Sequence, residues 1–154
     1  MDEIMRSFIK TICLMVFVMN LAPGPIQADD SIGTVKKLNG TATCLREKVE
    51  IKVKLGDPVF MKDVLKTDNP GSLGITLKDN TMISIGPNTV YTIDEFVFKP
   101  SEQKLAFVSK ISKGTLHFVS GTLIKLAPDA VKVKTPEGTI GFRGTRCLIR
   151  VEDN

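Results

Sequence analysis

Apolar and polar residues alternate along most of the chain after residue 31, and no window of a dozen residues shows the spacing of an amphipathic helix. Side chains of a strand point alternately to its two faces, so this period of two indicates strands. We therefore predict an all-β chain. The expected strands include residues 49–55, 73–77, 83–85, 91–93, 105–107, 116–118 and 131–133.

The clearest alternation runs from Val49 to Leu55, where four apolar residues are separated by Glu50, Lys52 and Lys54. One face of such a strand is apolar and the other is charged. We expect the apolar face to be buried and the charged face to lie in solvent.

Turn-forming sequences rich in Gly, Pro, Asn and Asp separate the strands at intervals of eight to fifteen residues. Residues 73–77 and 81–85 are expected to form a hairpin across Asp79-Asn80. Short strands at this spacing are typical of a compact multi-stranded sandwich or roll, or of a β-solenoid of stacked coils. The pattern leaves these architectures open, and no segment has the composition of a linker between domains.

The first 28 residues have the order of a secretory signal peptide. Arg6 and Lys10 precede the apolar stretch 12–21, which is shorter than the ~20 residues of a membrane-spanning helix. We expect cleavage between Ala28 and Asp29, which leaves residues 29–154 as one exported β domain that does not span the membrane. Its expected location is the periplasm or the exterior of the cell.

The chain carries a formal net charge of +4 without a cluster of adjacent basic residues. A nucleic-acid partner is therefore not expected, because such sites gather Lys and Arg on one face. An exported chain of this charge is better suited to anionic polymers of the cell envelope.

Two cysteines, Cys44 and Cys147, remain after the expected cleavage. Export permits a disulfide between them, and closing so long a loop contributes about 4–5 kcal/mol in the chain-entropy model. The alternative is two separate buried thiols. Neither cysteine has the neighbours of a metal site, and we predict no metal and no cofactor.

Candidate catalytic groups are few. The only histidine, His117, is expected to face solvent from a strand, and no nucleophile motif accompanies it. Four aspartates adjoin turn residues, where carboxylates commonly accept hydrogen bonds from their own backbone. We predict no catalytic residue and no enzyme activity, and keep hydrolysis by a pair of carboxylates as a third hypothesis. These aspartates are Asp57, Asp63, Asp68 and Asp79.

Tryptophan is absent and Tyr91 is the only tyrosine, so a stacking platform for sugars is disfavoured. Exposed edges of a β domain can instead accept a strand from another protein through backbone hydrogen bonds. Protein binding is therefore the function that the composition supports best.

The segment from residue 135 to residue 145 concentrates turn and charge signals. Its proline has no N–H to donate, and its glycines permit bends or close approach of another group. Ile140 and Phe142 alternate with small residues, as in a short buried strand, which places Arg143 on the opposite face. Arg143 either satisfies backbone carbonyls within a kinked strand or belongs to a docking patch. The candidate residues are Thr135, Pro136, Gly138, Gly141, Arg143, Gly144 and Thr145.

Short motifs follow one another in a recognisable order at residues 33–35, 40–42, 55–59, 63–67, 71–73, 77–81, 86–89, 113–116, 135–136 and 141–145. Together they resemble the FecR domain over about residues 32–151. The resemblance implies an all-β periplasmic domain, whose best-known members relay a signal from an outer-membrane iron-siderophore transporter to a sigma factor. Those members also carry a cytoplasmic segment, a membrane helix and a further small domain, which we do not expect here.

We therefore expect a non-enzymatic exported module that binds another protein or a polymer of the cell envelope. The alternative is a component of envelope signal transduction, of the iron-transport and sigma-factor type, that works with a separately encoded membrane partner. Signalling requires a partner with a membrane helix, whereas binding to a polymer does not.

Overall fold

The computed structural model describes residues 31–152. The predicted signal peptide, with its expected cleavage between Ala28 and Asp29, lies outside these residues. The described chain consists mainly of strands. They are β1 (Gly33–Asn39), β2 (Ala42–Arg46), β3 (Val49–Lys52), β4 (Pro58–Val59), β5 (Val64–Thr67), β6 (Ser72–Leu77), β7 (Met82–Ile85), β8 (Val90–Lys99), β9 (Lys104–Val119), β10 (Val131–Thr135), β11 (Gly138–Gly141) and β12 (Arg146–Val151). The helices are η2 (Pro100–Glu102), α2 (Thr122–Leu126) and η3 (Pro128–Ala130).

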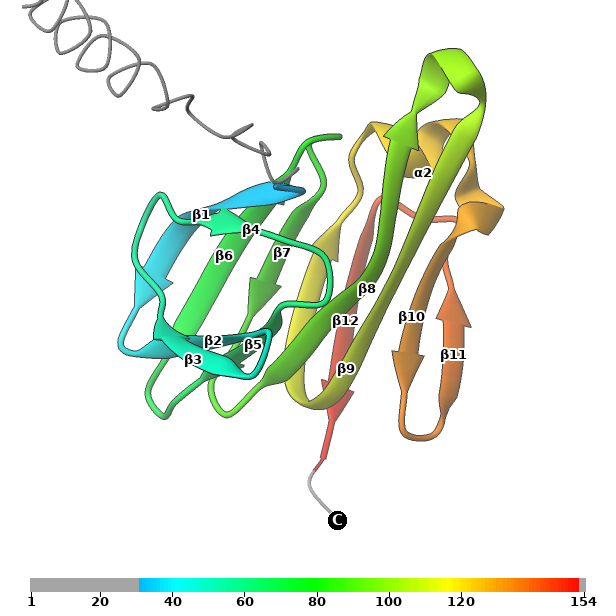
Figure 1. Cartoon of the computed structure of the whole chain (residues 1–154). Coiled ribbons are helices and arrows are strands. Elements are labelled where there is room, and N and C mark those ends of the chain that lie inside the picture. Colours follow the sequence, from blue (N-terminus) through cyan, green and yellow to red (C-terminus); the bar gives the residue numbers. More distant parts are fainter. Residues whose placement is uncertain (1–30, 153–154) are drawn as a thin grey trace, which may run out of the picture.

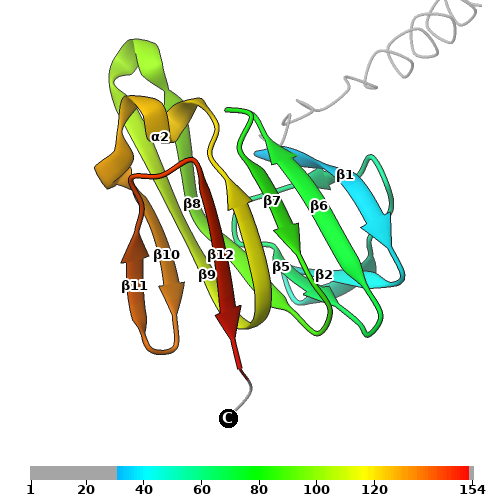
Figure 2. The ribbon, with the colours of Figure 1, turned by 180° about the vertical axis from the view of Figure 1, so that it is seen from behind.

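The prediction of an all-β fold is confirmed, since the strands form one curled sheet of 12 strands (Figure 1). The curl divides the sheet into two layers. The β6 layer contains β4, β1, β6, β7, the second part of β9 and β12. The β8 layer contains β3, β2, β5, β8, the first part of β9, β10 and β11. Figures 1 and 2 show the layers from opposite sides.

The strand β9 belongs to both layers. Its residues 104–113 pair with β8, and its residues 114–119 pair with β12. Gly114 lies at the transition with a φ of +94°. Gly114 therefore marks a bend within one continuous strand, and the predicted strands 105–107 and 116–118 are parts of this strand on either side of the bend.

Buried threonines hold the corner where the chain passes between the layers. The Thr67 hydroxyl donates to the Gly86 carbonyl at 2.6 Å and accepts from the Thr89 N–H at 3.0 Å. The Thr89 hydroxyl accepts from the Thr115 N–H at 3.0 Å. These bonds join the β5–β6 link, the β7–β8 link and the bend of β9. They satisfy backbone groups that the sheet ladder leaves without a partner at the corner.

The link between β1 and β2 reaches the same corner. The Asp68 N–H donates to the Thr41 carbonyl at 3.1 Å. Gly40 has a φ of +67°, and a Cβ at this position would lie 2.2 Å from the Pro70 carbonyl oxygen. Both the backbone conformation and the contact require glycine here.

Aromatic side chains connect the two layers across the core. Phe96, Phe107 and Phe118 lie in a row with ring centroids 6.4 Å and 5.6 Å apart. Phe142 stacks on Phe118 at 5.2 Å and extends the row beyond β11. Contacts of this kind add to the free energy gained from burying the rings.

Asp79 closes one end of the core. Its carboxylate is 1% exposed and accepts bonds from the Thr81 N–H, the Thr81 hydroxyl and the Leu123 N–H. The predicted hairpin of β6 and β7 is confirmed, and its turn thereby holds the start of α2. Leu123 and Ile124 of α2 are buried. In residues 31–152 no helix has both the length and the apolar character needed to cross a membrane.

The prediction of a buried apolar face for residues 49–55 is wrong. Val49, Ile51 and Leu55 are 61%, 39% and 68% exposed, and Val53 alone of the four apolar residues is buried. The reason is that β3 is the last strand of the β8 layer and pairs with β2 only, among the described strands. Alternation predicts a strand correctly but does not show whether its apolar face is covered.

The predicted disulfide is also wrong, because Cys44 and Cys147 are both free thiols. Cys44 lies on β2 and Cys147 on β12, and β5, β8 and β9 separate these strands along the sheet. A disulfide requires Cα atoms within about 7 Å of each other. The structure contains two separate thiols, as in the alternative, but only Cys44 is buried and Cys147 is partly exposed.

Replacing Gly114 with Ala should lower the free energy of unfolding by about 3 kcal/mol, because two costs combine. The new Cβ would lie 2.2 Å from the Thr89 hydroxyl, and the φ of +94° disfavours any side chain. Urea denaturation measures the change.

Two control glycines separate these costs. Gly56 has a φ of +89° but no atom within 4 Å of a Cβ, and Gly138 has neither constraint. Gly56→Ala should lose about 1 kcal/mol, and Gly138→Ala should change stability by less than about 0.5 kcal/mol. Equal losses at Gly114 and Gly56 would show that the contact with Thr89 does not matter.

Candidate functional site

The predicted docking segment, residues 135–145, forms the outer end of the β8 layer. β10 and β11 make a hairpin in which the Thr135 hydroxyl lies 3.2 Å from both the N and the O of Gly138. All four residues of β11 are exposed. The expectation that Ile140 is buried is wrong, since its side chain is 36% exposed on this last strand. β11 pairs with β10 and with no other described strand.

Phe142 anchors the segment in the core, where it is 7% exposed and stacked on Phe118. Thr145 is held through its carbonyl, which accepts from the Ser120 N–H at 2.9 Å. The chain between these points is therefore fixed at both ends.

Arg143 points into solvent. Its side chain is 82% exposed and its guanidinium lies 3.3 Å from the equally exposed Asp129 carboxylate. The hypothesis that Arg143 satisfies backbone carbonyls inside a kinked strand does not describe this geometry. A solvated ion pair of this kind contributes little to stability. Because the guanidinium is exposed, it is accessible to an incoming group.

A surface hollow lies beside the hairpin, with a volume of about 330 Å³. Its walls come from β10, β11, η3 and the Phe142-Arg143 pair, which places an arginine and an aromatic ring at its border. Lys132 and Asp129 add charged groups of opposite sign. The hollow can thus contact both apolar and polar side chains of a partner.

A second pocket, of about 200 Å³, lies between β2, β3 and β4. Arg46 and Asp63 form its polar side through two short bonds, at 2.8 Å from Nε to Oδ1 and 2.7 Å from Nη2 to Oδ2. Asp63 is 2% exposed and also accepts from the Phe60 N–H at 2.9 Å. The carboxylate is therefore fully engaged, as a buried charge must be.

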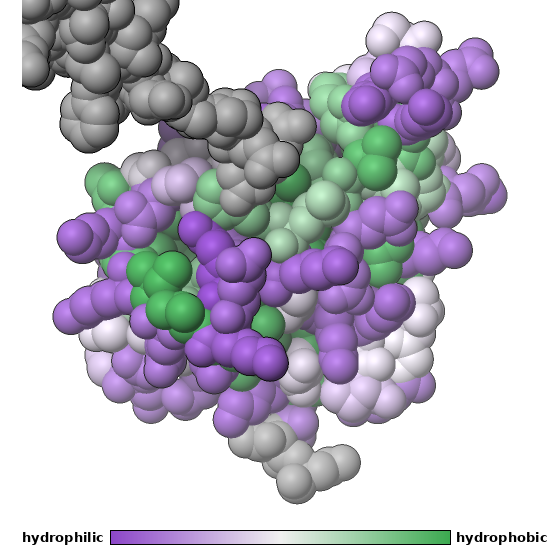
Figure 3. All heavy atoms as spheres, in the orientation of Figure 1, coloured by the Kyte–Doolittle hydropathy of each residue, from purple (hydrophilic) through white to green (hydrophobic). Residues whose placement is uncertain are grey.

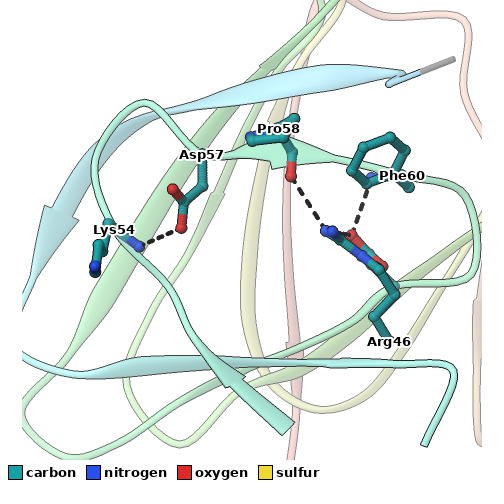
Figure 4. Close-up of polar contacts among 6 residues, drawn as sticks. Arg46, Lys54, Asp57, Pro58 and Phe60 are labelled. Atoms are coloured by element: carbon teal, nitrogen blue, oxygen red, sulfur yellow. Dashed lines mark hydrogen bonds and ion pairs between the residues drawn. The ribbon is translucent and has the colours of Figure 1, made fainter. Parts of the chain in front are cut away.

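Figure 4 shows how Arg46 is held. The guanidinium donates to the Pro58 carbonyl at 3.2 Å and lies over the Phe60 ring, 4.2 Å from its centroid. Nearby, the Asp57 carboxylate turns back to the Lys54 N–H at 2.7 Å. Arg46 thus ties β2 to the β4–β5 connection. The rest of the pocket is lined mainly by apolar side chains.

Comparison with known proteins identifies the family. A family model described as FecR protein matches residues 63–154. This chain belongs to the FecR family. A solved structure titled "Cell surface anchoring domain" is similar, with 34% sequence identity, coverage of 40% of this chain and 82% of that chain, and a TM-score of 0.39. No curated protein gives a significant match.

The FecR match begins at Asp63, so β1 to β4 precede it and β5 to β12 lie within it. The docking segment falls inside the match, whereas Arg46 and β3 fall outside it. Membership of the FecR family therefore applies to the docking segment, whereas Arg46 and β3 lie in a part of the chain that the family model does not match.

The other candidate residues of this FecR-family chain are dispersed. His117 is exposed on β9, as predicted. Asp57, Asp63 and Asp79 accept bonds from nearby backbone N–H groups, as expected for aspartates at turns. Tyr91 is 0% exposed and offers no surface for a sugar. Among the described side chains, no group of three His, Cys, Asp or Glu is placed to hold a metal ion.

The three glycines of the docking segment are not needed by the fold. A Cβ at Gly138 or Gly141 would meet no atom within 4 Å, and at Gly144 the nearest is 4.0 Å away. None of the three has the positive φ that excludes side chains. A close approach together with a backbone conformation that favours glycine is found at Gly40 and Gly114 instead.

Sequence reasoning missed Arg46. It faces Asp63 from another strand, and the two residues are 17 positions apart. An arginine that immediately precedes the two-residue turn at Glu47-Lys48 gives no local signal of burial. Asp63 was predicted to lie at a turn, but the sequence did not predict that its carboxylate is buried.

Replacing Arg46 with Met should lower the free energy of unfolding by about 2–3 kcal/mol, because Asp63 would keep a buried charge without its partner. Arg143→Ala is the matched control, since its pair with Asp129 is exposed on both sides. Thermal or urea unfolding of the control should match the unchanged protein. Equal losses in both variants would contradict the assigned difference in burial.

The two thiols should differ in reactivity at pH 8. Burial raises the pKa of Cys44 to about 11, with a further rise from the Asp63 carboxylate, and burial also raises the pKa of Cys147. Only the thiolate reacts, so Cys44 should be alkylated far more slowly in the native protein than the less buried Cys147. Mass spectrometry after iodoacetamide treatment measures both, and both should react after denaturation without a reductant. Failure to react then would indicate a disulfide.

Proposed function

We propose that this FecR-family chain is an exported, non-enzymatic module of the cell envelope that binds a segment of another envelope protein by strand addition to β11. The observation that carries the proposal is the character of β11. It is a terminal strand with four exposed residues and no charged side chain. Its outer edge presents backbone N–H and C=O groups for which the described chain supplies no strand.

Comparison with the other sheet edges supports this choice. Natural proteins protect edges with charges, prolines or very short strands. β12 carries Arg146 and Arg150, and β4 has two residues beginning with proline. β3 carries Glu50 and Lys52, which favour a strand of complementary charge over an uncharged segment. β11 has none of these features, and Pro136 lies before it in the turn.

The surroundings of β11 supply specificity. A strand added at β11 would lie beside the hollow bordered by Phe142 and Arg143. Backbone bonds then give affinity without regard to sequence, and the hollow selects side chains. Arg143, whose side chain is 82% exposed, is placed to bind a carboxylate or a carbonyl group of the partner. The glycines at both ends of β11 let a partner backbone approach without a side chain in its way.

The test is capture from the native envelope of the producing cell. The chain carries a photo-crosslinking residue at position 139 and an affinity tag, and crosslinked peptides are identified by mass spectrometry. We expect a defined peptide of one envelope protein, and we expect Ile140→Lys to reduce its capture at least about tenfold, because a lysine on an edge strand opposes pairing.

Met82→Lys is the matched control, because Met82 is also an exposed apolar strand residue, at 49%, but lies on the inner strand β7. It should leave capture unchanged. A membrane-anchored regulator or a transporter as the captured protein would favour the signalling alternative over simple binding. Capture of envelope polymer alone, or equal capture by Ile140→Lys, would overturn strand addition at β11.

A further inference from the structure

The outer edge of β3 is a second open edge, and its residues form a different pattern. All four residues of β3 are exposed, and β3 lies at the front of the molecule with its outer side uncovered (Figure 1). β3 and β11 lie at opposite ends of the β8 layer. Unlike β11, β3 alternates apolar residues with charges of opposite sign.

The turn before β3 determines which backbone groups face outward. Glu47 and Lys48 have φ angles of +49° and +71°, which define a two-residue type I′ hairpin between Arg46 and Val49. In such a hairpin the pair next to the turn is hydrogen-bonded, and alternate residues along the strand bond the partner strand. The Val53 N–H donates to the Ala42 carbonyl at 3.0 Å, which agrees with this alternation.

Val49, Ile51 and Val53 therefore direct their backbone groups to β2. The N–H and C=O groups of Glu50 and Lys52 point away from β2, to the open edge. The two residues whose backbones are available are thus the two that carry charges.

An apolar strip accompanies this edge. Val49, Ile51 and Leu55 are 61%, 39% and 68% exposed. Figure 3 shows a hydrophobic patch at the left of the molecule, over β3 and the connection to β4. An edge with exposed apolar side chains is a template for pairing with another strand.

We propose that two copies of this chain pair through β3, antiparallel and centred on Ile51. In this register Glu50 lies opposite Lys52 of the partner subunit, and the two-fold axis repeats the contact. Each of these two pairs exchanges two backbone hydrogen bonds, because both residues direct their backbone groups outward. Ile51 meets Ile51 of the partner subunit on the apolar side. The β8 layers of both copies then form one continuous sheet.

Charge selects this register among those with the same backbone pairing. A register centred on Glu50 places Glu50 opposite its own copy, and a register centred on Lys52 places Lys52 opposite its own copy. Like charges directly opposite each other are unfavourable in antiparallel sheets, and opposite charges are favourable. A two-fold contact of this kind is closed, so the product is a dimer rather than a fibre.

The proposal is independent of strand addition at β11. The two edges lie at opposite ends of the layer, and β3 also lies outside the residues that match the FecR model. β11 carries no charge that would favour a copy of itself over another strand.

The test is sedimentation of the chain, purified in the form that its producing cell makes, over a range of micromolar concentrations. We expect a dimer that dissociates on dilution. Glu50→Lys and Lys52→Glu should each weaken dimerisation by about tenfold or more, since each places like charges in both pairs. The double variant Glu50→Lys with Lys52→Glu should restore it.

Mixing the two single variants provides the sharpest outcome. One chain then has two lysines at the edge and the other has two glutamates, so the mixture should form a heterodimer while each variant alone is monomeric. Positions 50 and 52 are exposed, and circular dichroism should show unchanged folding in every variant. Ile51→Lys should also give a monomer, whereas Ile140→Lys on β11 should remain dimeric.

Several results would overturn the proposal. They are a monomer at all concentrations, a dimer that persists in Ile51→Lys, and charge variants that dimerise as well as the unchanged chain. Loss of dimerisation in Ile140→Lys would instead assign self-association to β11. Failure of partner capture at β11 with an intact dimer at β3 would separate the two proposals.

Discussion

The fold depends on how the chain turns from one layer to the other. The buried hydroxyls of Thr67 and Thr89 join three of these connections, because each hydroxyl replaces a backbone partner that the bent sheet cannot supply, and the Thr115 N–H is one of the groups that they bind. An unpaired buried N–H or C=O at this corner would cost more than one ordinary hydrogen bond contributes. Gly114 permits β9 to take part in both layers without colliding with Thr89.

The sequence was sufficient to predict the class of fold. Alternation located the strands, and turn residues located the hairpin of β6 and β7. The bend of β9 at Gly114 was not predicted, because the same glycine signal marks both a turn between strands and a bend within one. The roll could not be distinguished from a solenoid, since the order of strands in a sheet depends on contacts between distant residues.

Burial was harder to predict than strands. Val49, Ile51 and Leu55 have the pattern of a buried face, yet they lie on an edge that nothing in the described chain covers. The residues of segment 135–145 suggested either a kinked strand or a docking patch, but they did not predict the exposure of Ile140 and Arg143. Arg46 gave no local signal, because its role depends on Asp63 across the fold. Cys44 and Cys147 could not be placed relative to each other without knowing how many strands separate them.

The parallel pairing of β10 with β9 affects how the molecule would carry a mechanical load. β11 is joined to the rest of the sheet through β10, and β10 pairs with β9 at residues 107–110. A pull along a strand bound at β11 would act on these bonds in shear, so that they stretch together instead of opening one after another. The load would pass to the 16-residue strand β9, which is fixed in both layers. Under such a pull, the bonds between β10 and β9 would share the load, and the sheet would not open from one edge.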